Sequence, residues 1–165
     1  MPPDLPQFIE PLRLAEEERR LQGKLDASLM ERLQEVVLEP CGPVELDMAF
    51  SKDEKGVIRI TGDYRVKVRL LCQRCLEAME LTLANPFNIG MVAADGDAGS
   101  TDEYEQVTLE GREIALAPLI EDEILLGLPM SPRHALPDCA AAAELLKRAP
   151  EKSSPFAVLK NLKPR

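Results

Sequence analysis

Two cysteines three positions apart, Cys72 and Cys75, have a spacing that is typical of metal or thiol chemistry. They lie in the segment CQRC, between two stretches that each predict a β-strand. A turn of this kind brings both sulfur atoms to one side and supplies half of a tetrahedral zinc site. The only histidine, His134, and Cys139 lie together in HALPDC and could supply the other half. We therefore predict one structural zinc ion held by Cys72, Cys75, His134 and Cys139.

Other interpretations of CQRC stay open. A redox pair usually has its first cysteine at a helix N-terminus, so the predicted flanking strands disfavour thioredoxin-like chemistry. A metal-free turn fits the same pattern, with Cys72 packed in the core and Cys75 partly exposed. Cys41, in a turn rich in proline and glycine, is the substitute ligand if His134 faces away.

Alternating sequence patterns predict the sheet that must position these cysteines. Apolar and polar residues alternate from Val44 to Phe50 and again from Ile58 to Cys72. A third strand from Met79 is expected to stop at Pro86, and Gly62 stands where a β-bulge would fit. These consecutive strands predict an α+β fold built on an antiparallel β-meander or open barrel with one solvated face.

A few short helices are expected to pack on this sheet. Ser28 and Glu31 have the spacing of a capping box, which predicts a helix over about residues 29–34. A second helix should begin near Pro118, because proline is tolerated only near a helix start. Its acidic residues 121–123 point in different directions and are expected at the surface, although a pair of their carboxylates could contact the basic strand. The apolar face of this second helix comprises Leu116, Leu119, Ile120 and Ile124.

Net charge and hydropathy limit the classes of protein that fit this sequence. The formal net charge is −9, which argues against extensive phosphate contacts, yet residues 147–165 contain six basic residues and one acidic residue. We predict a single domain over residues 1–146, with an acidic loop at about 93–105, followed by a basic tail over residues 147–165. No apolar run approaches the roughly 20 residues that cross a bilayer, and no signal peptide is recognisable, so a cytoplasmic location is expected.

Basic side chains are the candidate contacts for RNA or a protein partner. Arg65, Lys67 and Arg69 share the polar face of one predicted strand, and Arg74 lies between the cysteines of CQRC. Such a row could follow phosphates, or it could be a solvated face balanced by acidic residues on neighbouring strands. In the tail, apolar residues at helical spacing could order on a partner or dock on the domain itself. The tail candidates are Phe156, Lys160 and Lys163.

Four features together resemble the YceD family of large ribosomal RNA subunit accumulation proteins. They are CQRCLE after a basic strand, a helix ending in EDEILLGLPMSPRH, the following Cys139, and the terminal SPFAVLKNLK. The similarity extends from about Pro11 to Lys163, and Ser154 replaces the asparagine of the usual family ending. The resemblance implies a bacterial cytoplasmic factor needed for the synthesis, processing or stability of large-subunit (23S) ribosomal RNA, and it implies no known reaction.

We therefore expect a non-enzymatic ribosome-biogenesis factor that binds the large-subunit rRNA precursor, a basic ribosomal protein, or both. The acidic body favours a basic protein, because complementary charge speeds association. A zinc-dependent hydrolase or nuclease acting on rRNA is the main alternative. It is less favoured, because catalytic zinc needs an open coordination position and four protein ligands would fill the site. A metal-free protein-interaction domain is the third interpretation.

Overall fold

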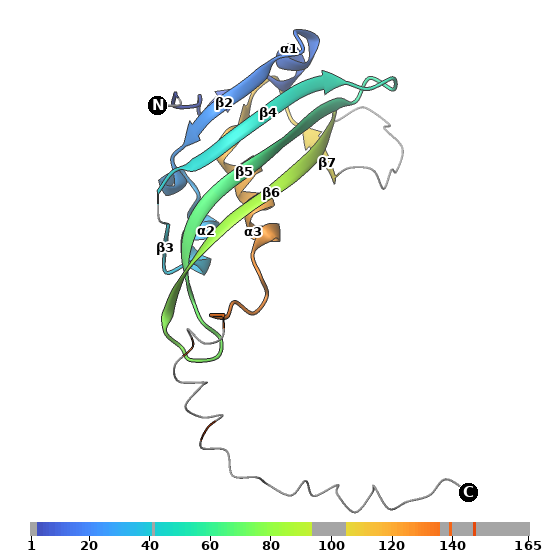
Figure 1. Cartoon of the computed structure of the whole chain (residues 1–165). Coiled ribbons are helices and arrows are strands. Elements are labelled where there is room, and N and C mark those ends of the chain that lie inside the picture. Colours follow the sequence, from blue (N-terminus) through green and yellow to red (C-terminus); the bar gives the residue numbers. More distant parts are fainter. Residues whose placement is uncertain (1–2, 41, 94–104, 136–138, 140–146, 148–165) are drawn as a thin grey trace, which may run out of the picture.

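A curved six-stranded sheet dominates the computed structural model, which describes residues 3–40, 42–93, 105–135, 139 and 147 (Figure 1). Its strands are β2 (Arg20–Leu25), β3 (Glu39–Pro40), β4 (Val44–Lys52), β5 (Ile58–Leu71), β6 (Ala78–Ala93) and β7 (Glu105–Leu109). They are ordered β2-β4-β5-β6-β7, and β3 pairs separately with β5. The predicted α+β class with an open antiparallel meander is confirmed in β4, β5 and β6. One pairing differs from the prediction, since β7 runs parallel to β6.

The helices are short, and α2 and α3 lie on the same face of the sheet (Figure 1). They are α1 (Pro11–Glu16), the 3-10 helix η1 (Ala27–Leu29), α2 (Glu31–Val36) and α3 (Leu116–Gly127). Two further strands, β1 (Phe8–Ile9) and β8 (Ile114–Ala115), form a small antiparallel pair of their own. The N–H group of Leu116 donates to the carbonyl of Gln7 over 2.9 Å, so this small pair fixes the point from which α3 starts.

The core forms where the alternating face of β5 meets α3. The predicted face of β5 is buried at Ile58, Ile60, Tyr64, Val66, Val68 and Leu70. The predicted face of α3 is buried as well, at Leu116, Leu119, Ile120 and Ile124. Burying one such side chain contributes about 1.5–3 kcal/mol, so these two faces provide a large part of the driving force for folding.

Both predicted helix starts differ from the structure. The first of these helices, α2, begins at Glu31, and Ser28 belongs to the preceding η1. The predicted capping box is wrong: the Ser28 N–H donates to Asp26 Oδ1 over 2.9 Å, so Asp26 caps η1 instead. The second helix, α3, begins at Leu116, two residues before Pro118. Pro118 still lies in the first turn, where its missing N–H removes no intrahelical bond.

The predicted bulge at Gly62 is wrong. Gly62 pairs in regular register with Met48 on β4 and with Phe87 on β6. A side chain at this position would run into the backbone carbonyl of Asp47 and the ring of Phe87. Glycine is therefore needed at this position because the neighbouring strands approach closely, and not because the backbone is irregular.

The predicted end of the third strand at Pro86 is also wrong, since β6 continues to Ala93. β7 pairs with β6 only from Ile89 onward, so the paired part of that edge begins beyond Pro86. Proline is tolerated at such an edge, where its missing N–H interrupts no ladder.

Several predictions fall outside the described residues. These are most of the acidic loop, Cys41, and the tail except for Lys147. The division into a domain and a basic tail stays a prediction. Among the described helices, none combines the length and apolar character required to span a bilayer.

Candidate metal centre

Four predicted ligands come together at the end of the β5–β6 hairpin: Cys72, Cys75, His134 and Cys139. Their candidate ligand atoms all lie within 4.8 Å of one another. Cys72 and Cys139 are buried, whereas Cys75 and His134 are half-buried. In a tetrahedral zinc site, bonds of about 2.0–2.3 Å separate neighbouring ligand atoms by about 3.5–3.8 Å, so the cluster has the dimensions of a single-ion site.

The turn that carries the first two cysteines, residues 72–77, will be called the knuckle. It is closed by two backbone hydrogen bonds of 2.9 Å, from Cys72 N–H to the Glu77 carbonyl and from Leu76 N–H to the Cys72 carbonyl. Leu76 has a φ of +59°, a left-handed conformation that costs a non-glycine residue about 1–2 kcal/mol. In this conformation the chain turns back so that the Glu77 N–H donates to the sulfur of Cys75. The backbone of the knuckle thus directs an N–H group toward a cysteine sulfur atom.

The second pair of ligands arrives on the segment that follows α3. The Gln73 N–H donates to the Pro132 carbonyl over 2.8 Å and holds this segment against the knuckle. Two residues later, the backbone N–H of His134 donates to Cys72 Sγ over 3.4 Å. The Cys139 N–H donates to the Ala135 carbonyl over 3.3 Å, and the Cys139 sulfur lies within 4.8 Å of the other ligand atoms.

The electrostatics of the cysteines favour a bound cation. Burial opposes ionisation of Cys72, but the backbone N–H groups of Cys75, His134 and Arg74 outweigh it and lower the pKa of this thiol to about 5. The Glu77 N–H favours ionisation of Cys75, yet burial and the nearby Cys72 and Cys139 raise its pKa to about 11. Neighbouring sulfur atoms cannot all ionise unless a positive charge lies among them, and a divalent metal ion supplies that charge.

The predicted basic residues lie on and around the same hairpin. Arg65 and Lys67 are exposed on the outer face of β5, and Arg74 is exposed in the knuckle. Arg69 forms an ion pair with Glu39 on β3, and Arg65 lies opposite Glu45 on β4.

This outer face is therefore partly neutralised by acidic neighbours, as one of the two interpretations expected. Lys67 lies opposite the uncharged Thr82 on β6. Arg133, which the sequence analysis did not select, is exposed beside His134 and adds a further positive charge near the knuckle. The position of Arg133 next to a predicted ligand is the feature of the sequence that could have identified it. The tail candidates Phe156, Lys160 and Lys163 lie outside the described residues.

One acidic residue of α3 is buried, contrary to the prediction that residues 121–123 all lie at the surface. Glu121 is only 4% exposed. Its carboxylate accepts a hydrogen bond from Leu33 N–H over 2.8 Å and one from Arg32 Nε over 3.1 Å, and these contacts join α3 to α2. Its spacing of four from Ala117 and three from Ile124 places it on the buried face, a signal that the charge obscured.

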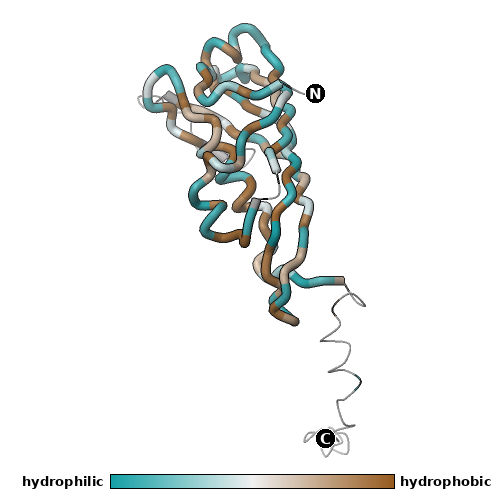
Figure 2. The backbone as a smooth tube through the Cα atoms, turned by 90° about the vertical axis from the view of Figure 1, so that its left-hand side faces the viewer, coloured by the Kyte–Doolittle hydropathy of each residue, from teal (hydrophilic) through white to brown (hydrophobic). Residues whose placement is uncertain are grey.

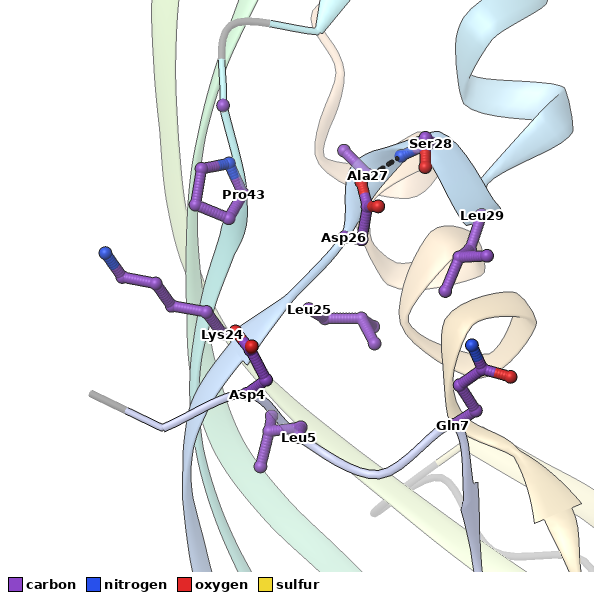
Figure 3. Close-up of a pocket in the computed structure, with 11 residues that line it drawn as sticks. Asp4, Leu5, Gln7, Lys24, Leu25, Asp26, Ala27, Ser28, Leu29 and Pro43 are labelled. Atoms are coloured by element: carbon purple, nitrogen blue, oxygen red, sulfur yellow. Dashed lines mark hydrogen bonds between the residues drawn. The ribbon is translucent and has the colours of Figure 1, made fainter. Parts of the chain in front are cut away.

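A separate cavity of about 640 Å³ lies between the N-terminal segment, η1 and the start of β4 (Figure 3). Its charged residues do not converge on one point. Asp26 is engaged by the N–H of Ser28, and Lys24 extends away from Leu25 and Leu29 (Figure 3). We find no arrangement of catalytic groups among the described residues that line this cavity.

Comparison with known proteins identifies similar sequences. A family model described as Large ribosomal RNA subunit accumulation protein YceD matches residues 60–163. A protein from Haemophilus influenzae named Large ribosomal RNA subunit accumulation protein YceD is 32% identical over 167 aligned residues, which cover 96% of each chain. No solved structure matches the chain. The residues matched by the family model include all four members of the candidate metal centre.

Proposed function

The chain belongs to the YceD family, and we propose that it is a non-enzymatic ribosome-biogenesis factor that supports the accumulation of large-subunit rRNA by binding it. The observation that carries the proposal is the position of the candidate metal centre, at the tip of a long hairpin that also bears exposed basic residues. A rigid tip of this kind suits a contact surface for RNA, because ordered basic groups can match phosphates at fixed spacing.

We propose that the metal is zinc and that its role is structural. Three cysteines and one histidine are a common ligand set for structural zinc. The four side chains would occupy all four tetrahedral positions, which leaves none for a reactive water. In this role zinc would hold the segment after α3 against the knuckle, and an rRNA hydrolase is correspondingly disfavoured.

The RNA contact is assigned to Lys67, Arg74 and Arg133 on the domain, together with Lys160 and Lys163 in the tail. The first three are exposed: Lys67 lies on β5, Arg74 lies in the knuckle, and Arg133 directly precedes His134. The tail carries most of its charge as lysine and arginine, which suits a phosphate backbone even though the whole chain is acidic.

Ultraviolet crosslinking in growing bacteria, followed by sequencing of the bound RNA, tests this function. Full-length protein is expected to enrich fragments of the large-subunit rRNA or its precursor over small-subunit rRNA, and the Lys67→Ala/Arg74→Ala variant should lose that enrichment. Purified protein incubated with the same RNA should leave it intact. Equal recovery of both rRNAs, or cleavage of the RNA, would contradict the proposal.

A second candidate partner is a basic protein of the large subunit. It is favoured by the charge distribution, since residues 1–146 carry a net −14 once the basic tail is set aside. Exposed acidic residues of the outer face, such as Glu45 and Asp63, could bind such a protein. Protein–protein crosslinks that persist after ribonuclease treatment would favour this partner over RNA.

A further inference from the structure

An apolar groove of about 200 Å³ lies directly beside the candidate metal centre. Its walls come from α2, the end of β5 and the segment after α3, and they include Val36, Leu71, Met130, Pro132 and the backbone of Gln73. Met130 is fully exposed, Val36 is 58% exposed and Leu71 is 38% exposed. Figure 2 shows apolar residues at this end of the domain, near the tip of the hairpin.

Apolar side chains so close together usually have a partner, because a contiguous exposed apolar patch is a typical docking site. The groove has the volume to accept one or two large side chains. Its lining is aliphatic, so it suits a peptide segment with large apolar residues better than a phosphate backbone.

We propose that residues 156–162 of this same chain occupy the groove, with Phe156 as the anchoring side chain. The first argument is where the chain leaves the described structure. The carbonyl of Pro132, in the wall of the groove, accepts a hydrogen bond from the Gln73 N–H. The chain then continues to His134 and the buried Cys139. The C-terminal segment therefore starts next to the groove.

The second argument is reach. Phe156 follows Cys139 by 17 positions. A random-coil chain of that length has a root-mean-square span of about 23 Å. A tether of this kind gives the segment an effective concentration in the millimolar range, so that even a weak apolar contact would be populated.

The third argument is the pattern of side chains. Phe156, Leu159 and Leu162 recur at intervals of three, which places them on one side of a helical turn. Lys160 and Lys163 flank this side and would keep their ammonium groups in water while the apolar residues are buried.

Docking would also bring these two lysines close to Arg74 and Arg133. The tail and the domain would then present one continuous basic surface. The use of this surface to bind RNA rests on the proposed function, whereas the docking of the tail does not.

A single tryptophan can report the docking, because the chain contains none. In full-length Phe156→Trp protein without RNA, the emission should be blue-shifted and shielded from acrylamide quenching. Adding Met130→Asp or Val36→Asp should remove both effects, because both side chains line the groove, and both are exposed and so contribute little to the buried core. Leu12→Asp, on α1, is the matched control: it changes an exposed leucine away from the groove and should leave the emission unchanged.

A second measurement keeps the native phenylalanine. Deletion of residues 153–165 should shift the methyl resonance of Met130 and leave that of the buried Met48 in place. Three results would each overturn the proposal. The first is a tryptophan that is fully accessible to acrylamide. The second is a shielded tryptophan whose emission is unchanged by the groove substitutions, and the third is shielding that increases with protein concentration. The last two results would indicate another docking place and a second copy of the chain, respectively. Because neither measurement contains RNA, failure here leaves the proposed function to be judged by its own crosslinking test.

Discussion

The Sγ atom of Cys75 lies 3.3 Å from Nδ1 of His134, although the two residues are 59 positions apart in the chain. This contact joins the tip of the β5–β6 hairpin to the segment that leaves α3. A single ion between the two atoms would join the first half of the domain to the last, and the strongest predictions concern that connection.

Metal content should depend on the four clustered residues and not on Cys41. Protein purified without a chelator or a metal-binding tag is expected to contain about one zinc per chain, measured by inductively coupled plasma mass spectrometry. Cys139→Ser should lose the metal and melt at a lower temperature, since structural zinc binding can contribute on the order of 10 kcal/mol. Cys41→Ser is the control and should keep both properties. Unmodified protein without zinc would leave the knuckle as a metal-free turn.

The stability of metal-free protein should rise with pH between about 5 and 9. The folded state lowers the pKa of Cys72 from its ordinary value of 9.0 to about 5, so across this window the unfolded state binds the extra proton. This contribution is complete above pH 9 and is lost as the pH falls to about 5. The raised pKa of Cys75 acts only above pH 9, in the opposite direction.

Urea unfolding at several pH values in the presence of a chelator checks this expectation. Cys72→Ser should flatten the increase, whereas Cys41→Ser should preserve it. An equal slope in Cys72→Ser and the unmodified protein would show that other groups cause the pH dependence.

RNA binding should weaken when basic residues of the β5–β6 hairpin are removed. Lys67→Ala and Arg74→Ala should each reduce affinity and lower the salt dependence of binding by about one counterion, as expected for a lost phosphate contact. Fluorescence anisotropy with a labelled large-subunit rRNA fragment measures both. Lys52→Ala is the matched control, because Lys52 is paired with Glu16 over 2.9 Å. Equal loss in all three variants would indicate nonspecific attraction.

The buried carboxylate of Glu121 should contribute more to stability than its exposed neighbour. Glu121→Ala removes the acceptor for the N–H of Leu33, and a buried donor left without a partner costs about 1–3 kcal/mol. Asp122→Ala removes an exposed ion pair with the same Arg32 and should cost less than about 1 kcal/mol. Chemical denaturation of both variants gives the comparison, and similar losses would contradict the difference in burial.

The sheet could be predicted from the sequence because a strand with one buried face displays its period directly. Apart from Gly62, the even positions of β5 carry apolar side chains or Tyr64, and they are the buried positions. The metal candidates could be found for a related reason, since cysteine and histidine are few in this chain and their chemistry narrows their roles. In both cases the residue types carry the information.

Features that depend on distant neighbours could not be predicted in this way. The parallel pairing of β7 and the regular register at Gly62 are set by which strands lie alongside. Glu121 could not be distinguished from Asp122 by charge, because only the approach of Arg32 and Leu33 makes its burial favourable. The strand continues through Pro86 because a strand-breaking residue is tolerated at an unpaired edge, and only the position of β7 reveals that this edge is unpaired there.

The order of the ligands along the chain has a consequence for protein synthesis. Cys75 precedes Cys139 by 64 residues, so at about 5–20 residues per second the ribosome exposes the knuckle several seconds before the other half of the centre is made. During that interval the nascent chain presents a two-thiol half-site that cannot retain a metal tightly. Completion of the centre, and with it the fixing of the hairpin tip, must therefore wait until Cys139 has been synthesised.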